Sequence, residues 1–287
     1  MFNKRKRSTR RWSVRAIELM IVLVAMMATA SILFPEPQVK EIRVIEVVDA
    51  PVRPANADEL IVASYDAALN YMYDEDYANS ATLLAAITNA AQDHYWSHVT
   101  YSFVLYEQGH YDAAIQVASE GISIDPNDPV AWNNRCLLRA LTGDLTGGLS
   151  DCNHSIQVDP TYDYNFNNRC YILTQLGQLN EAERDCLQAL KNGHRMPEWV
   201  YTNLGQIALM RSLPMLAEDH FRTALDYNPM HADAYAGLGD TMLVEAQYNK
   251  ALNYYNIYRN YAGVHYNISF DVKVEYVAQT LANLGQN

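Results

Sequence analysis

A repeat of 34 residues runs through most of the chain and restricts the folds that are open to it. Asp125-Pro126 and Asp159-Pro160 lie 34 residues apart, and Asn228-Pro229 follows 69 residues later, at two periods plus one residue. A glycine recurs with the same period, at Gly109, Gly143 and Gly177. Self-similarity of this kind is the signature of a solenoid or a related repeat array. We expect a loop near residues 192–195 to absorb the extra residue.

Each unit is predicted to fold as two helices. The units begin at Ile61, Tyr95, Pro129, Asp163, Glu198 and Ala232. Pro or Asp near the start of a unit favours a helix N-terminus, and the glycine in its middle favours a turn. Small side chains recur where the two helices would cross, which lets them pack closely. On the first helix they are Ala68, Ser102, Cys136, Cys170, Gly205 and Gly239, and on the second Ser80, Ala114, Gly148, Ala182, Ala217 and Ala251.

The units resemble the tetratricopeptide repeat family. That family has Trp, Leu-Gly, Tyr, Ala, Phe and a closing Pro at fixed offsets, and the matching residues here are Trp132, Leu204-Gly205, Leu238-Gly239, Ala217, Phe221 and Pro229. Gln92 and His194 stand where two closing prolines belong. The resemblance implies an all-α, right-handed α-solenoid with six helix-pair repeats over residues 59–265.

The last repeat of a solenoid needs a covering element with a polar outer face, and residues 266–287 are predicted to supply it as a C-terminal capping helix. Val274, Val277, Leu281 and Leu284 would share the face of that helix that packs on the repeats.

The start of the chain is typical of an export signal or a membrane anchor. Residues 1–15 hold seven basic residues and no acidic one, and residues 16–34 are apolar with Glu18 as their only charge. A helix needs ~20 apolar residues to span a bilayer. The positive-inside rule then puts the N-terminus in the cytoplasm and the repeats outside. We expect a retained N-terminal transmembrane helix followed by an extended linker over 35–58; cleavage near Ala30 and secretion is the alternative, and a buried core helix is a third interpretation.

The charge distribution limits the partners. The formal net charge is −12, and without the seven basic charges of residues 1–15 the rest of the chain carries −19. A body this acidic repels nucleic acid and favours neutral or basic partners.

The sequence has no constellation typical of an enzyme. A Gly-rich phosphate loop, Cys-x-x-Cys and His-Glu-x-x-His are all missing, so we expect no catalysis, no cofactor and no metal. His94 and His98 are four residues apart and would share a helix face, but a surface His beside a packing His is the favoured interpretation.

Four cysteines form two pairs with the same spacing. Cys136 and Cys152 are 16 residues apart, as are Cys170 and Cys186, with one cysteine on each helix of a unit. In an exported protein they are candidates for disulfides, whereas free Cys also serves as a small apolar residue. We expect these slots to be about a turn out of register, which favours the second interpretation.

An Arg and an Asp recur beside the cysteines. Arg135 and Asp151 lie 16 residues apart, as do Arg169 and Asp185, and units that lack the Arg also lack the Asp. Because an unpaired buried charge is costly, we predict an ion pair within each unit, with a structural role rather than a role in ligand contact.

The resemblance implies that the first helices line a concave binding face. Side chains predicted there are Tyr65, Tyr73, Trp96, Phe103, Tyr106, Asn133, Tyr164, Asn167, Tyr171 and Trp199. Asn134, Asn168 and Asn203 occupy one slot in three successive units, where peptide-binding members of the family use Asn to clasp an extended backbone. An equal alternative is that these asparagines only bond to local backbone groups. Family members that bind acidic C-terminal peptides hold them with Lys and Arg side chains. This chain lacks Lys and Arg at the matching slots, so we do not expect a partner of that class.

The sequence therefore predicts a membrane-anchored, non-catalytic scaffold that binds an extended segment of another protein. The alternatives are an envelope module that binds glycan and a scaffold that self-associates through exposed Tyr.

Overall fold

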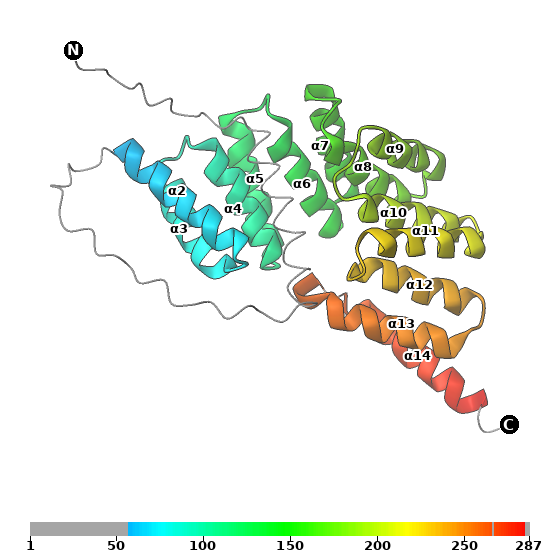
Figure 1. The fold of residues 1–287 in the computed structure, drawn as a ribbon. Helices are drawn as coiled ribbons and strands as arrows, with labels where there is room; N and C mark the ends of the chain where they lie inside the picture. The colour runs from blue at the N-terminus through cyan, green and yellow to red at the C-terminus, as the bar shows by residue number, and fades with distance from the viewer. Residues whose placement is uncertain (1–56, 266, 285–287) are drawn as a thin grey trace, which may run out of the picture.

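The computed structural model describes residues 57–265 and 267–284, and these form an all-α array (Figure 1). The predicted anchor over residues 16–34 and nearly all of the predicted linker lie outside the described residues. Among the described residues there are thirteen α-helices, one 3-10 helix and no strand. The α-helices are α2 (Ala57–Tyr73), α3 (Tyr77–Ala90), α4 (Tyr95–Glu107), α5 (Tyr111–Ile124), α6 (Pro129–Leu141), α7 (Leu145–Val158), α8 (Asp163–Gln175), α9 (Leu179–Lys191), α10 (Pro197–Met210), α11 (Pro214–Tyr227), α12 (Ala232–Val244), α13 (Tyr248–Tyr261) and α14 (Ser269–Leu284), with the 3-10 helix η1 (Gly263–His265) before α14.

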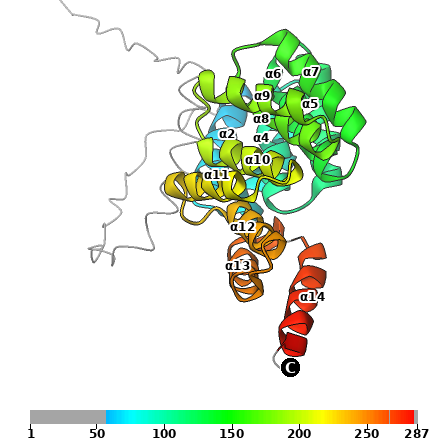
Figure 2. The same ribbon diagram turned by 90° about the vertical axis from the view of Figure 1, so that its right-hand side faces the viewer.

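The helices pair as the 34-residue period predicts. Six hairpins, from α2–α3 to α12–α13, follow one another in a curved stack (Figures 1 and 2). The loop over 192–196 between α9 and α10 is one residue longer than the other loops between units, so the extra residue lies where we expected it.

The turn inside each hairpin requires one residue with left-handed backbone. Gly109, Gly143 and Gly177 take φ values of 75°, 91° and 73° there, a conformation that glycine adopts without strain. In the other three units the same slot holds a residue with a side chain, at φ values between 57° and 60° (Glu75, Ser212 and Ala246). The fold thus imposes this conformation even where the sequence carries no glycine.

The small residues lie where the helices of a hairpin cross, as predicted. All twelve are buried. A Cβ placed on Gly148 would come within 2.8 Å of the carbonyl oxygen of Cys136, and one placed on Gly239 would clash with the ring of Tyr255. Close backbone approach therefore fixes the geometry of each hairpin.

The last helix, α14, caps the array only in part. Val277 is fully buried against α13, with Val274 and Leu281 beside it. Leu284 is 60% exposed, so its predicted place on the packed face is wrong, because it lies at the last residue of the helix. The outward side of α14 and the turn before it also expose Ile268 and Val272.

Within residues 57–265 and 267–284, no helix has the length and apolar character that a bilayer crossing requires.

Candidate functional site

The first helices of successive units form one continuous layer. α4 contacts α6, α6 contacts α8, α8 contacts α10 and α10 contacts α12, while each second helix packs on its own hairpin partner and on the next unit. We call the layer formed by α2, α4, α6, α8, α10 and α12 the inner layer.

All eight aromatic residues predicted for the binding face are half-buried in the inner layer; they are Tyr65, Tyr73, Trp96, Phe103, Tyr106, Tyr164, Tyr171 and Trp199. Three of them take part in the joints between units. Tyr65, Tyr164 and Trp199 pack on His94, His194 and His231, with ring centroids 5.3, 4.9 and 4.4 Å apart. Aromatic contacts of this kind add to the stability of the joint, so these three have a structural task as well.

Burial keeps one of these joint histidines neutral. His231 precedes α12 and is 4% exposed, and desolvation lowers its pKa to about 4. The sequence analysis did not predict this packing role for His94, His194 and His231.

The asparagines connect neighbouring units. The side-chain amide of Asn168 donates to Asn133 Oδ1 at 2.9 Å, and that of Asn203 donates to Asn167 Oδ1 at 3.0 Å. The amide of Asn134 donates to Ser102 Oγ at 3.1 Å. Each of the three asparagines therefore bonds to the preceding unit, and Asn168 and Asn203 each use one of their two amide hydrogens for this bond.

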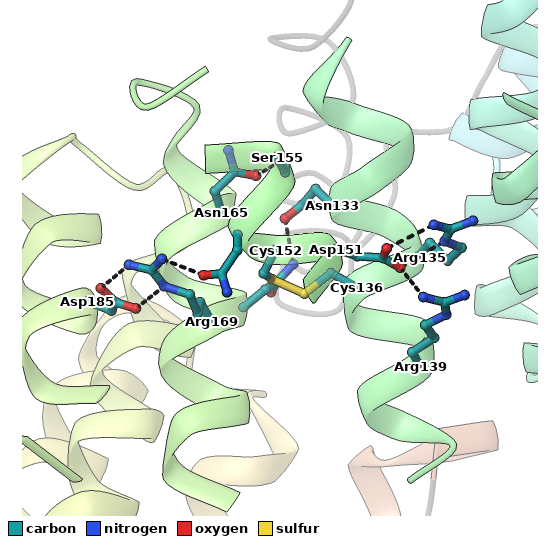
Figure 3. The surroundings of a disulfide bond; sticks show 12 residues. Asn133, Arg135, Cys136, Arg139, Asp151, Cys152, Ser155, Asn165, Arg169 and Asp185 are labelled. Atoms are coloured by element: carbon teal, nitrogen blue, oxygen red, sulfur yellow. Dashed lines mark hydrogen bonds and ion pairs between the residues drawn. A yellow bond between two sulfur atoms is a disulfide. The ribbon is translucent and has the colours of Figure 1, made fainter. Parts of the chain in front are cut away.

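The two predicted ion pairs are present (Figure 3). The Arg135 guanidinium donates twice to the Asp151 carboxylate, both times at 2.8 Å, and Arg139 adds a third bond at 3.0 Å. Arg169 donates twice to Asp185, at 2.6 and 2.9 Å. Paired, bidentate geometry offsets the cost of burying these charges.

Each of these arginines also reaches the preceding unit. Arg135 donates to Ser119 Oγ at 3.0 Å, and Arg169 donates to Asn153 Oδ1 at 2.8 Å. Each guanidinium therefore bridges two successive second helices.

Both cysteine pairs form disulfides, and our expectation of free thiols was wrong. The Cα atoms lie 5.3 Å apart for Cys136–Cys152 and 5.4 Å apart for Cys170–Cys186, within the range that a disulfide spans. All four side chains are fully buried. The expected register offset is absent because the cysteines stand at the crossing of their hairpins, beside Gly148 in the first case. Figure 3 shows the first bridge next to Asp151.

The pair His94 and His98 serves packing. His98 is buried, with Nδ1 3.2 Å from the His94 carbonyl oxygen and Nε2 3.7 Å from Glu120. In the part of the chain that the structure describes, no three His, Cys, Asp or Glu side chains are arranged to hold a metal ion.

One contact joins the end of the repeat array, at η1, to the second unit. His265, in η1, lies beside the turn between α4 and α5, with Nδ1 2.8 Å from Tyr111 Oη and its ring stacked on Tyr106 at 4.7 Å. Its Nε2 lies 3.8 Å from Glu107. The sequence analysis missed this contact because it joins residues 154 positions apart and does not follow the period.

Asp233, in the first turn of α12, acts electrostatically on two tyrosines of other units. Its negative charge raises the pKa of Tyr106 on α4 and of Tyr171 on α8, although desolvation is the larger cause in both. The carboxylate reaches solvent, yet crowding by the surrounding helices raises its own pKa, and His265 opposes that effect.

Comparisons with known proteins identify the fold. No protein-family model and no curated protein matches this sequence. Among solved structures, it is similar to a chain of the APC/C hetero-tetramer Cut9-Hcn1, with 10% identity and a TM-score of 0.64 over 76% of this chain and 42% of that one. It is also similar to PilW, a type IV pilus biogenesis factor, with 15% identity and a TM-score of 0.59 over 76% of this chain and 100% of that one.

A third similar structure is a thermophilic TPR protein from Thermus thermophilus. Identity is 16% and the TM-score 0.55, over 64% of this chain and 99% of that chain. At such identities the likeness establishes the architecture, a helical solenoid of tetratricopeptide-like repeats.

Proposed function

We propose that this chain is a non-catalytic interaction module that holds an extended segment of a partner protein against its inner layer. The observation that carries the proposal is the row of half-buried aromatic side chains along that layer, of which Phe103 and Tyr171 lie outside the three histidine joints and Tyr106 stacks on His265. Aromatic side chains that keep part of their surface open are the usual source of binding energy at protein interfaces.

Binding through these rings differs from the clasp suggested by the family resemblance. Because Asn134, Asn168 and Asn203 each bond to the preceding unit, we assign the main share of the affinity to apolar contact of the partner with the rings. The asparagines then hold the units in register, and the rings in position.

We further propose that the module works outside the cytoplasm, tethered by residues 16–34. Two fully buried disulfides support this location, because disulfides persist in oxidising compartments. The basic residues 1–15 ahead of an apolar stretch support the same orientation.

Selection from a library of displayed random peptides tests the proposal. We expect the full-length protein in detergent to enrich binders, and Tyr106→Ala with Tyr171→Ala to lose them. The matched control is Leu187→Ala with Met215→Ala, two exposed apolar residues on the second helices α9 and α11. Binders that survive the tyrosine variant but not the control would refute the inner layer as the binding face. Retention on purified cell-wall glycan with no peptide enriched would favour the envelope-binding alternative.

A further inference from the structure

We propose that the turn between α4 and α5 carries a socket for an arginine side chain of the segment that the inner layer binds, and that His265 fills this socket until that arginine displaces it. The socket consists of Tyr106 and Glu107, which end α4, and Tyr111, which begins α5. This inference rests on the proposed function, and it adds the chemistry of the partner and the control of access to the same face.

The imidazole ring of His265 contacts each of the three residues of the socket. It stacks on the ring of Tyr106, with the centroids 4.7 Å apart and an angle of 23° between the ring planes. Its Nδ1 lies 2.8 Å from Tyr111 Oη, and its Nε2 lies 3.8 Å from a carboxylate oxygen of Glu107. The socket therefore holds a planar, nitrogen-bearing group by one ring face, one hydroxyl group and one carboxylate.

The segment that carries His265 is fixed at its ends rather than along its length. η1 has three residues, and none of them is buried. On one side of it, Ala262 is buried against α12 and α13. On the other side, the backbone amide of Asn267 donates to Tyr258 Oη at 3.0 Å. Because few buried contacts hold η1, His265 can leave the socket while α13 and α14 stay in place.

The socket is open to solvent and adjoins the aromatic row of the inner layer. The side chains of His265 and Glu107 are 33% and 25% exposed. The ring of Tyr106 lies 6.3 Å from that of Phe103 and 6.0 Å from that of Tyr111, between centroids. A segment that packs on Phe103 therefore comes within reach of the socket.

The chemistry of the socket favours arginine as the group that replaces His265. A guanidinium is planar, stacks on aromatic faces and donates hydrogen bonds in several directions, so it can use the Tyr106 ring, the Tyr111 hydroxyl and the Glu107 carboxylate together. Burial raises the pKa of Tyr106 and Tyr111, and the charge of Glu107 raises both further. Both hydroxyl groups thus stay neutral, while the carboxylate opposes an anion and attracts a cation.

The test uses two small probes and the full-length protein in detergent. N-acetyl-arginine methylamide carries the guanidinium, and N-acetyl-citrulline methylamide has nearly the same shape without the charge. Ligand-observed NMR titration gives a dissociation constant for each. His265→Ala empties the socket, and His110→Ala is the matched control, because His110 is an exposed histidine of the same turn.

We expect the arginine probe to bind His265→Ala at least about fivefold more tightly than it binds the unchanged protein or His110→Ala, because a stacked ring and a hydrogen bond no longer compete with it. On His265→Ala, the citrulline probe should bind at least about tenfold more weakly than the arginine probe. Adding Glu107→Gln to His265→Ala should remove most of that preference. Equal affinity of the arginine probe for His265→Ala and the unchanged protein, which a merely structural role of His265 predicts, overturns the inference, as does equal affinity of the two probes.

A second measurement needs no substitution. In the unchanged protein, the ring carbon–proton resonance of His265 should move towards that of an exposed histidine as the arginine probe saturates the site. Binding of the arginine probe without a change in this resonance overturns the displacement of His265.

The peptide selection described above separates this inference from the proposed function. Binders that depend on the inner layer but carry no excess of Arg, and that bind His265→Ala no better than the unchanged protein, refute the socket and leave the proposed function intact. A selection with no binder that depends on the inner layer refutes the proposed function itself.

Discussion

Asp151 is a buried carboxylate on which two arginines converge, and replacing it by Asn should cost a large share of the stability. Its side chain is 3% exposed and accepts three hydrogen bonds from Arg135 and Arg139. Asp151→Asn keeps the shape, removes the charge and leaves Arg135, itself only 13% exposed, without its counter-ion. Breaking a buried pair from one side costs about 3–5 kcal/mol.

Unfolding in urea, followed by far-ultraviolet circular dichroism, measures this loss. The control is Asp144→Asn, because Asp144 is 56% exposed and lies 3.8 Å from Arg139, where an ion pair contributes ~0–1 kcal/mol. Replacing both partners, as in Arg135→Leu with Asp151→Val, should cost less than Asp151→Asn, because no buried charge is then left unpaired. Equal losses for Asp151→Asn and Asp144→Asn would refute the reasoning.

Three further predictions concern the turns, the joints and the disulfides. Ser212→Gly should raise the free energy of unfolding by about 1 kcal/mol, because Ser212 takes a φ of 60° that strains a residue with a side chain; a lower melting temperature would contradict this. His231 has a pKa of about 4 in the folded chain against an ordinary 6.5, so the free energy of unfolding should fall by up to about 3 kcal/mol as pH falls from 6.5 to 4, because the unfolded chain takes up the proton first. His231→Phe should make the melting temperature depend less on pH across that range. An unchanged pH dependence would argue against burial of His231 as the cause. Cys136→Ala with Cys152→Ala should cost ~3 kcal/mol in urea unfolding, because the bridge closes a loop of about 15 residues; the difference should vanish when variant and unmutated protein are compared after reduction of both, and a difference that persists would contradict the bond as its cause.

The repeat period was enough to predict most of the fold. It placed the helix pairs and the small residues at the crossings, because each of these recurs in every unit, and the single break in the period placed the extra residue near 192–195. It also predicted the pairs Arg135–Asp151 and Arg169–Asp185, since the two slots change together. Periodic features are local to a unit or to two neighbouring units, and the sequence displays them several times.

Features that depend on exact geometry were not predictable in the same way. The disulfides depend on a Cα separation of 5.3–5.4 Å, whereas helix register alone led us to expect the cysteines about a turn apart. The bonds of Asn168 and Asn203 to the preceding unit depend on side-chain direction. The contact of His265 with Tyr106 and Tyr111 depends on how far each unit rotates relative to the last, and small rotations accumulate over the array before these residues meet.

Site-specific photo-cross-linking tests the central claim most directly. p-Benzoylphenylalanine replaces Tyr171 in the inner layer or Leu187, which is 53% exposed on α9, in the full-length protein in intact cells. We expect one defined protein adduct from position 171, which disappears when Tyr106→Ala is added, and none from position 187. Adducts that form from position 187 and not from position 171 would contradict binding at the inner layer.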